Sequence, residues 1–352
     1  MPGGWRPTTV PAAASLGRPL QWDRIGRYYN VLKLNHIPKS ISAALPLVLV
    51  TAILAGVFSC QKRTPTQPPP IQPGEQWTAR SSGGLYDLRD IATNGSILVA
   101  VGDSARILTS DSGVNWTLRI APTGAALSGI VSTLNFGFVS VSSSGGGDTV
   151  LLSSDGLSWT APPTAGITIG LNDVTGFGNM LIAVGCNGSI FTSSSGVSWT
   201  QKTSGGVCVE SVKRAGLTNV QYVAVGQDGT IYTSPEGLLW YPRPSGVTNW
   251  FRDLVCGCSR IVAVGDDGII KSSTNGVNWV TADSVGVDLN AITCSGDSFV
   301  AVGDGGAIFT SFDGGVTWVR RTSPTTKDLT GVHRTESKLV AVGLDGTILT
   351  SP

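Results

Sequence analysis

Few side chains in this sequence of 352 residues have the chemistry that catalysis requires. After Cys60 there is a single histidine, His333, so a histidine-rich metal site is excluded and a Ser-His-Asp triad would depend on that one residue. Glycoside hydrolysis stays open, because two carboxyl groups about 6.5 to 9.5 Å apart in space can be distant in sequence. We predict no catalytic residue, no metal and no cofactor, and we keep a secreted glycosidase with a carboxylate pair as the alternative.

A polar position recurs between two apolar residues of the repeat described below. Its occupants differ in charge and size: Arg89, Ser128, Asn172, Glu210, Arg252, Asn290 and Thr330. With neighbours such as Asp87 and Asp253 they could form a mixed-charge funnel that grips a peptide, a sugar or a loop of a partner. Ordinary solvated loop ends are the alternative interpretation. The residues we predict to bind a partner are Arg89, Asn172, Glu210, Trp250, Arg252 and Asn290.

Trp250 is included because it stands outside the regular series of tryptophans and two residues before Arg252. An exposed aromatic side chain beside an arginine is typical of contact hot spots. Alternatively, Trp250 covers a gap between two repeats.

Five cysteines follow Cys60 and could form disulfides in an oxidising compartment. They are Cys186, Cys208, Cys256, Cys258 and Cys294. Cys256 and Cys294 hold equivalent places in neighbouring repeats, so we favour a bridge between them over scattered buried thiols. Cys256-Gly257-Cys258 lacks the second pair that a zinc site needs.

The elements that would position these residues follow from a repeat of about 40 residues. Seven tryptophans recur at intervals of 39 to 43 residues: Trp77, Trp116, Trp159, Trp199, Trp240, Trp279 and Trp318. The phrase between them is clearest in FVAVGDGGAIFTSFDGGVTW, from Phe299 to Trp318. Its β-branched and aromatic runs, its Gly-containing turns and an apolar pair upstream, such as Leu329 and Val332, predict four short strands per unit.

Four strands every 40 or so residues are typical of a propeller blade. The chain stops at Leu349–Pro352, where a blade still lacks its Trp strand, and Gln76–Arg80 is such a strand. We therefore predict an all-β, seven-bladed β-propeller over residues 76–352, with four-stranded blades and closure by the N- and C-terminal strands. A closed ring leaves no exposed sheet edge, so we expect a monomer.

The turn before two of the tryptophans, Trp116 and Trp318, matches [ST]-x-D-x-G-x-x-W. This pattern resembles the Asp-box, or BNR, repeat. The resemblance implies a structural turn in which Asp accepts backbone N–H groups, Gly adopts a positive φ and Trp covers the hairpin. The residues so assigned are Asp111, Gly113, Trp116, Asp313, Gly315 and Trp318. Asp-box propellers include sialidases, which is the origin of the glycosidase alternative.

The wider phrase, AVG followed by a Gly turn, a strand and the box, is similar to repeats of the photosystem II stability/assembly factor family and its non-photosynthetic bacterial relatives. The resemblance covers residues 76–352 and implies a seven-bladed propeller that binds or chaperones a partner. It implies fold better than function.

Charge argues against nucleic acid as a partner. Six of the 24 Lys and Arg and one of the 23 Asp and Glu precede Cys60, which leaves 18 basic and 22 acidic residues after it. Phosphate binding favours clustered Lys and Arg, whereas the part of the chain after Cys60 is mildly acidic.

The N-terminal region is predicted to direct export. Residues 41–60 hold nineteen uncharged residues followed by Cys60, after a basic region in residues 1–40. Val57–Cys60 resembles a bacterial lipobox, in which the Cys carries the lipid, although Phe58 departs from the usual small residue. An uncleaved signal anchor is the alternative. Residues 61–75, with five prolines, are predicted to form an extended linker.

Together these features predict an exported, lipid-anchored protein of the bacterial cell envelope, periplasmic or at the cell surface. We expect a non-enzymatic binding or assembly propeller that holds a protein or glycan partner on one loop face. A purely structural spacer or adhesin module is a third possibility.

Overall fold

The computed structural model of the protein describes residues 72–144, 150–257 and 260–352. The predicted extension, the export signal with Cys60 and most of the linker lie outside these residues, as does Cys258. The chain divides into two compact units, Met1–Pro68 and Pro69–Pro352, and the described residues belong to the second. No helix in the described part of the chain is long and apolar enough to cross a membrane.

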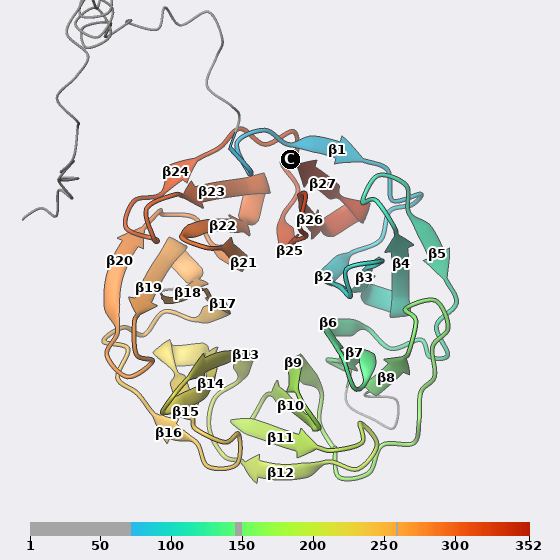
Figure 1. Ribbon diagram of the computed structural model, residues 1–352, viewed down its shortest axis with the longest axis vertical. Coiled ribbons are helices and arrows are strands. Elements are labelled where there is room, and N and C mark those ends of the chain that lie inside the picture. The colour runs from blue at the N-terminus through green and yellow to red at the C-terminus, as the bar shows by residue number, and fades with distance from the viewer. Residues whose placement is uncertain (1–71, 145–149, 258–259) are drawn as a thin grey trace, which may run out of the picture. The chain divides into compact units, whose positions relative to one another are not determined.

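Seven antiparallel sheets form the blades of a β-propeller, which confirms the predicted fold (Figure 1). The innermost strands are β2 (Leu88–Thr93), β6 (Leu127–Thr133), β9 (Leu171–Phe177), β13 (Val209–Leu217), β17 (Phe251–Cys256), β21 (Leu289–Ser295) and β25 (Leu329–Arg334). The second strands are β3 (Leu98–Gly102), β7 (Gly137–Ser142), β10 (Met180–Gly185), β14 (Val220–Gly226), β18 (Ile261–Gly265), β22 (Ser298–Gly303) and β26 (Leu339–Gly343). We number the blades 1 to 7 in the order of these inner strands.

The third strands are β4 (Arg106–Ser110), β8 (Val150–Ser153), β11 (Ser189–Ser193), β15 (Ile231–Ser234), β19 (Ile269–Ser273), β23 (Ala307–Ser311) and β27 (Ile348–Ser351). The outer strands are β5 (Thr117–Arg119), β12 (Thr200–Thr203), β16 (Tyr241–Pro242), β20 (Val280–Ser284), β24 (Val319–Arg320) and β1 (Thr78–Arg80). Short 3-10 turns join the second and third strands of five blades: η1 (Asp103–Ala105), η2 (Gln227–Gly229), η3 (Asp266–Gly268), η4 (Asp304–Gly306) and η5 (Leu344–Gly346).

Blade 2 departs from the four-stranded pattern. Its outer segment makes only one bridge, between Leu152 and Thr160. Pro162 and Pro163 follow, and proline has no N–H to donate to a neighbouring strand. Pairing therefore stops after a single bridge.

The core lies between successive blades. Every residue of β18 and β26 is buried, because a second strand has a neighbouring blade on each face. One apolar cluster joins Val262 of blade 5 to Phe299 of blade 6. Complete burial of a side chain such as Phe299 contributes about 1.5–3 kcal/mol. The inner strands alternate instead, so that Leu88 is buried while Arg89 is exposed.

A serine holds the turn before each of the seven regularly spaced tryptophans. The glycine three residues before Trp279, Gly276, accepts the indole N–H on its carbonyl at 3.1 Å and donates its own N–H to Ser273 Oγ at 2.8 Å. The same pair of bonds recurs in all seven blades, at Trp77, Trp116, Trp159, Trp199, Trp240, Trp279 and Trp318. Gly113 and Gly315 have φ values of 73° and 81°, which favour glycine.

Side-chain capping of this turn varies from blade to blade. The Asp313 carboxylate accepts the N–H groups of Val316 and Thr317, as the resemblance implies. In blade 1 the acceptor for the N–H of Val114 is Ser112 rather than Asp111. Asp111 lies one residue too early to reach over the turn, because the loop of Asp313 contains an additional residue between its serine and its glycine.

The ring closes as predicted, with the first strand completing the last blade. Strand β1 pairs with β27, so that Thr78 lies opposite Thr350. The terminal turn is shared as well, because Gly74 donates its N–H to Ser351 Oγ.

Candidate binding site at the mouth of the central channel

The seven polar residues singled out in the sequence lie around one opening of the central channel. They are Arg89, Ser128, Asn172, Glu210, Arg252, Asn290 and Thr330, and they share this opening, which we call the mouth, with Ser143. Each is the second residue of an inner strand. The side chain at that point turns away from the apolar core, so the repeat brings seven polar side chains into one ring.

The two mouth arginines are fixed by aspartates of their own blade. Arg89 makes a two-pronged ion pair with Asp103, at 3.0 and 2.9 Å. Arg252 donates from Nε to Asp266 at 2.7 Å, and in both pairs the aspartate follows the arginine by 14 residues. These aspartates begin the turns η1 and η3, which lie over the start of the inner strand. The hydrogen bond with Asp103 raises the pKa of Arg89 above its ordinary value.

Other mouth residues join neighbouring blades. The Ser128 and Thr330 hydroxyls each donate to a backbone carbonyl of the next inner strand, at 2.6 Å. The side-chain amides of Asn172 and Asn290 do the same, at 3.0 and 3.1 Å. Asn290 also donates to Asp304 at 2.8 Å. These four side chains thus connect neighbouring blades by hydrogen bonds.

Trp250 does not line the mouth itself but lies beside two of its residues, Arg252 and Glu210. The Arg252 guanidinium stacks on the Trp250 ring, with Cζ 4.2 Å from the centroid. The Trp250 Nε1 atom is buried and makes no regular hydrogen bond among the described residues. Its N–H and the Arg252 charge both lower the pKa of Glu210, but burial outweighs them and the pKa is raised.

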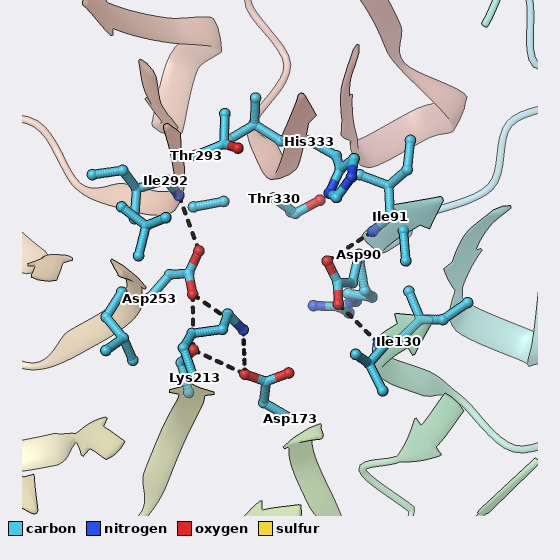
Figure 2. A pocket seen from close by; sticks show the side chains of 18 of the residues that line it. Asp90, Ile91, Ile130, Asp173, Lys213, Asp253, Ile292, Thr293, Thr330 and His333 are labelled. Carbon is cyan, nitrogen blue, oxygen red and sulfur yellow. Dashed lines mark hydrogen bonds and ion pairs between the residues drawn. The ribbon is translucent and has the colours of Figure 1, made fainter. Parts of the chain in front are cut away.

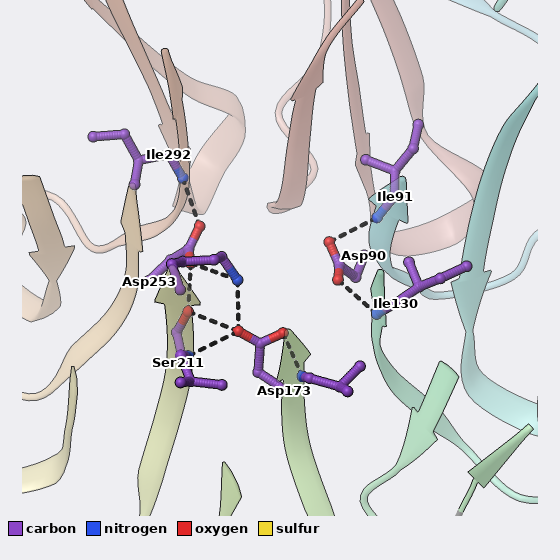
Figure 3. A network of polar contacts seen from close by, with 10 residues as sticks. Asp90, Ile91, Ile130, Asp173, Ser211, Asp253 and Ile292 are labelled. Atoms are coloured by element: carbon purple, nitrogen blue, oxygen red, sulfur yellow. Dashed lines mark hydrogen bonds and ion pairs between the residues drawn. The ribbon is translucent and has the colours of Figure 1, made fainter. Parts of the chain in front are cut away.

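Beneath the mouth the channel contains a cavity of about 340 Å³ lined by the inner strands. Its polar floor comes from aspartates one residue further along: Asp90, Asp173 and Asp253 (Figure 2). Each of them accepts a backbone N–H from the next blade, those of Ile130, Val212 and Ile292 respectively (Figure 3).

Asp253 is predicted near the mouth and lies in this deeper layer, whereas Asp90 and Asp173 were missed as site residues. The triplet apolar-polar-Asp, in LRD, LND and FRD, is the signal that could have identified them.

Lys213 joins two of these aspartates. Its ammonium lies 2.5 Å from Asp173 and 3.7 Å from Asp253. Ser211 lies between the same carboxylates, 2.9 Å from Asp173 and 2.8 Å from Asp253. Burial opposes the charge of Lys213, but the surrounding carboxylates outweigh it and raise its pKa. About a third of the Lys213 side chain is accessible, and it lines the channel cavity.

Asp90 and His333 lie on the channel wall opposite Lys213 and Asp253 (Figure 2). Burial raises the pKa of Asp90 to about 7, despite the opposing effect of Lys213. Burial and the Lys213 charge lower the pKa of His333 to about 4, so its imidazole is neutral at pH 7. His333 is thus a residue of the channel wall.

The predicted Cys256–Cys294 bridge is wrong, because Cys256 is a free thiol. Equivalent positions of successive blades point to the same side. Cys256 therefore packs into the cluster between blades 4 and 5, and Cys294 into the one between blades 5 and 6. Burial raises the pKa of Cys256 to about 12. The disulfide that forms joins Cys186 of blade 3 to Cys208, two residues before Glu210 at the mouth.

No group of three or more His, Cys, Asp or Glu could hold a metal ion in residues 72–144, 150–257 and 260–352. The channel side chains are instead engaged with backbone amides and with one another.

No protein-family model and no curated protein matches this chain. Solved structures do. YCF48 bound to D1 peptide has a TM-score of 0.65 at 18% identity, over 80% of this chain and 97% of that one. YCF48 from Cyanidioschyzon merolae has a TM-score of 0.63 at 19% identity, over 78% and 98%. The WD40 propeller domain of Doa1 has a TM-score of 0.63 at 11% identity, over 79% and 97%. At these identities the likeness establishes the seven-bladed fold, and the two YCF48 structures support the predicted similarity to photosystem II assembly factors at that level.

Proposed function

We propose that the protein is a non-enzymatic binding propeller whose mouth holds a segment of a protein partner, with a glycan as the alternative ligand. The observation that carries the proposal is the convergence of seven polar side chains, of five types, on one opening. A channel cavity of about 340 Å³ below it provides depth. Cavities of this size are in the range that proteins use for ligands.

Preorganisation supports the same function. Arg89, Arg252 and Asn290 are held by ion pairs or hydrogen bonds to Asp103, Asp266 and Asp304, so little side-chain entropy remains to be lost on binding. Trp250, stacked beneath Arg252, resembles the aromatic and arginine pairs of contact hot spots. A YCF48 propeller of similar fold binds a D1 peptide, which favours a protein partner here.

The setting we propose is the bacterial cell envelope. The uncharged segment before Cys60 supports export, and the lipobox-like Val57–Cys60 supports attachment of a lipid at Cys60. An uncleaved signal anchor is the alternative. The proline-rich linker would hold the propeller away from the membrane.

The experiment compares capture of envelope proteins by the full-length chain and by the triple variant Arg89→Ala, Trp250→Ala, Arg252→Ala. A partner identified by mass spectrometry should be retained by the wild type and lost from the variant. The matched control is Phe177→Ala with Arg214→Ala, a stacked pair with Cζ 3.5 Å from the ring centroid toward the opposite ends of the inner strands.

Equal loss of the partner from the control variant would assign binding to another face. Capture that survives in the triple variant would remove the mouth as the site.

A glycosidase is the second candidate, favoured by one observation. Asp90 faces Asp173 and Asp253 across the channel, and its pKa of about 7 suits a general acid (Figure 2). Hydrolysis of aryl glycosides by the wild type that is lost in Asp90→Asn would support this candidate. If the wild type hydrolyses none of the aryl glycosides tested, the three aspartates have only a structural role.

A further inference from the structure

The channel cavity has more carboxylates than cations. Asp90, Asp173, Glu210 and Asp253 line it, against Arg89, Lys213 and Arg252. Both arginines are already paired, with Asp103 and Asp266. His333 is neutral at pH 7. Lys213 is therefore the one cation among the described lining residues that balances the channel carboxylates, and Asp173 and Asp253 already share it.

Two of the carboxylates have no ion-pair partner in the described part of the chain. Asp90 is enclosed by the channel wall, and each of its oxygens accepts a single backbone N–H, from Ile91 and Ile130. A carboxylate oxygen has capacity for a second hydrogen bond. Glu210, at the entrance, has the buried Trp250 Nε1–H as a neighbouring donor, in a contact outside regular hydrogen-bond geometry, and it has no ion-pair partner among the described residues. A carboxylate in an enclosed site without a cationic partner is costly and requires an explanation.

We propose that the channel cavity is a receptor for one alkylammonium or guanidinium group, delivered by a lysine or arginine side chain of the partner, with Glu210 at the entrance and Asp90 at depth as its acceptors. This inference rests on the proposed binding function and names the side chain that enters the mouth. An ammonium supplies only donors, which matches a site that contains unused acceptors. An anionic group would meet excess negative charge, and an apolar side chain would leave both carboxylates unpaired.

Ionisation of Asp90 makes the affinity depend on pH. With a pKa of about 7, Asp90 is largely protonated at pH 5.5 and ionised at pH 8.5. The charged or titratable groups around it are Lys213, Asp173, Asp253 and His333. Lys213, with its raised pKa, keeps its charge in this range, and His333 stays neutral. Affinity for a cation therefore rises with pH across this range.

The test measures binding to the full-length chain by calorimetry. The probe is Nα-acetyl-lysine methylamide, whose ε-ammonium group is free. N-acetyl-norleucine methylamide is the uncharged control of similar shape. We expect saturable binding of the lysine probe, at least 10-fold weaker binding of the norleucine probe, and at least 10-fold tighter binding at pH 8.5 than at pH 5.5.

Glu210→Gln and Asp90→Asn should each lower the affinity for the lysine probe at least 10-fold. Glutamine has the shape of Glu210 and keeps an oxygen that can accept the Trp250 N–H, so we expect this variant to keep its fold even if Asp90→Asn does not. The matched control is Phe177→Ala with Arg214→Ala, which should bind the probe like the wild type.

Equal binding of both probes, no binding by the wild type, or full affinity in Glu210→Gln would each overturn the proposal. Cadaverine, added as a second probe, separates the sources of the ammonium. Much tighter binding of cadaverine than of the lysine probe would overturn the assignment to a partner's side chain in favour of a free amine. The probes are small and need no partner, so their failure beside an intact partner capture would refute this inference alone.

Discussion

Ser351 accepts a hydrogen bond from the backbone N–H of Gly74 at 2.9 Å, although 277 residues separate them. Trp77 then donates its indole N–H to the Gly74 carbonyl, so the two ends of the propeller build the same turn that each other blade builds from contiguous residues. The closure of the ring thus involves side chains as well as the β1–β27 ladder.

Ser351→Ala should destabilise this closure. The buried Gly74 N–H would lose its acceptor, which costs about 1–3 kcal/mol. Chemical denaturation measures the loss of unfolding free energy, and hydrogen exchange should accelerate in β1 and β27. Ser273→Ala, at the equivalent place inside the chain, should cost a similar amount without faster exchange in β1, and Ser158→Ala, an exposed serine, should have no effect. Unchanged exchange in β1 would contradict the role of Ser351.

Lys213→Met should lower stability because Asp173 and Asp253 lose their shared cation. Removing one partner of a fully buried ion pair costs about 3–5 kcal/mol, and we expect roughly 3 kcal/mol or less because a third of this side chain is accessible. Thermal and denaturant unfolding would measure it. Lys202→Met, on the partly exposed outer strand β12, is the control and should change stability little. A Lys213 variant as stable as the wild type would show that channel water compensates the carboxylates.

The neutral state of His333 should make stability depend on pH. Its pKa is about 4 in the folded protein against an ordinary value of 6.5, so the unfolded chain binds more protons in this window. The stabilisation is complete above pH 6.5 and disappears as pH falls to about 4, with an upper limit of about 3 kcal/mol. Asp90 acts in the opposite sense, because its raised pKa stabilises most at low pH and loses that contribution as pH rises through about 7.

Since the two effects partly cancel, the measurement is the difference between wild type and His333→Asn in melting temperature from pH 4 to pH 7.5. The variant should gain relative to the wild type as pH falls below 6.5. Parallel curves would show that His333 titrates normally.

Loss of the Cys186–Cys208 disulfide should also destabilise the propeller. The bond closes a loop of 22 residues between blades 3 and 4, and loops of this size are worth roughly 3 kcal/mol. Cys186→Ser with Cys208→Ser should lower the melting temperature to that of the reduced wild type. Cys256→Ser keeps the disulfide and should retain its sensitivity to reductant. If reductant leaves the melting temperature of the wild type unchanged, the disulfide adds no stability.

The sequence by itself determined the propeller, its blade number and its closure. Repetition carried this information: seven tryptophans at nearly equal intervals, each preceded by Gly and an apolar strand, admit one periodic architecture. The mouth was equally accessible, since a position that repeats once per blade must form a ring once the blades close. Arg89 and Glu210 therefore could be assigned to the same mouth although they are 121 positions apart in the sequence.

Only the tertiary structure decided how side chains meet across blades. Equivalence in the repeat suggested Cys256 and Cys294 as partners, but equivalent residues point in the same direction and into different inter-blade clusters. Contacts between blades join positions that are offset in the repeat, as Cys186 is from Cys208 and Lys213 from Asp173. That offset depends on the tilt and stacking of neighbouring sheets, which the repeat period does not contain.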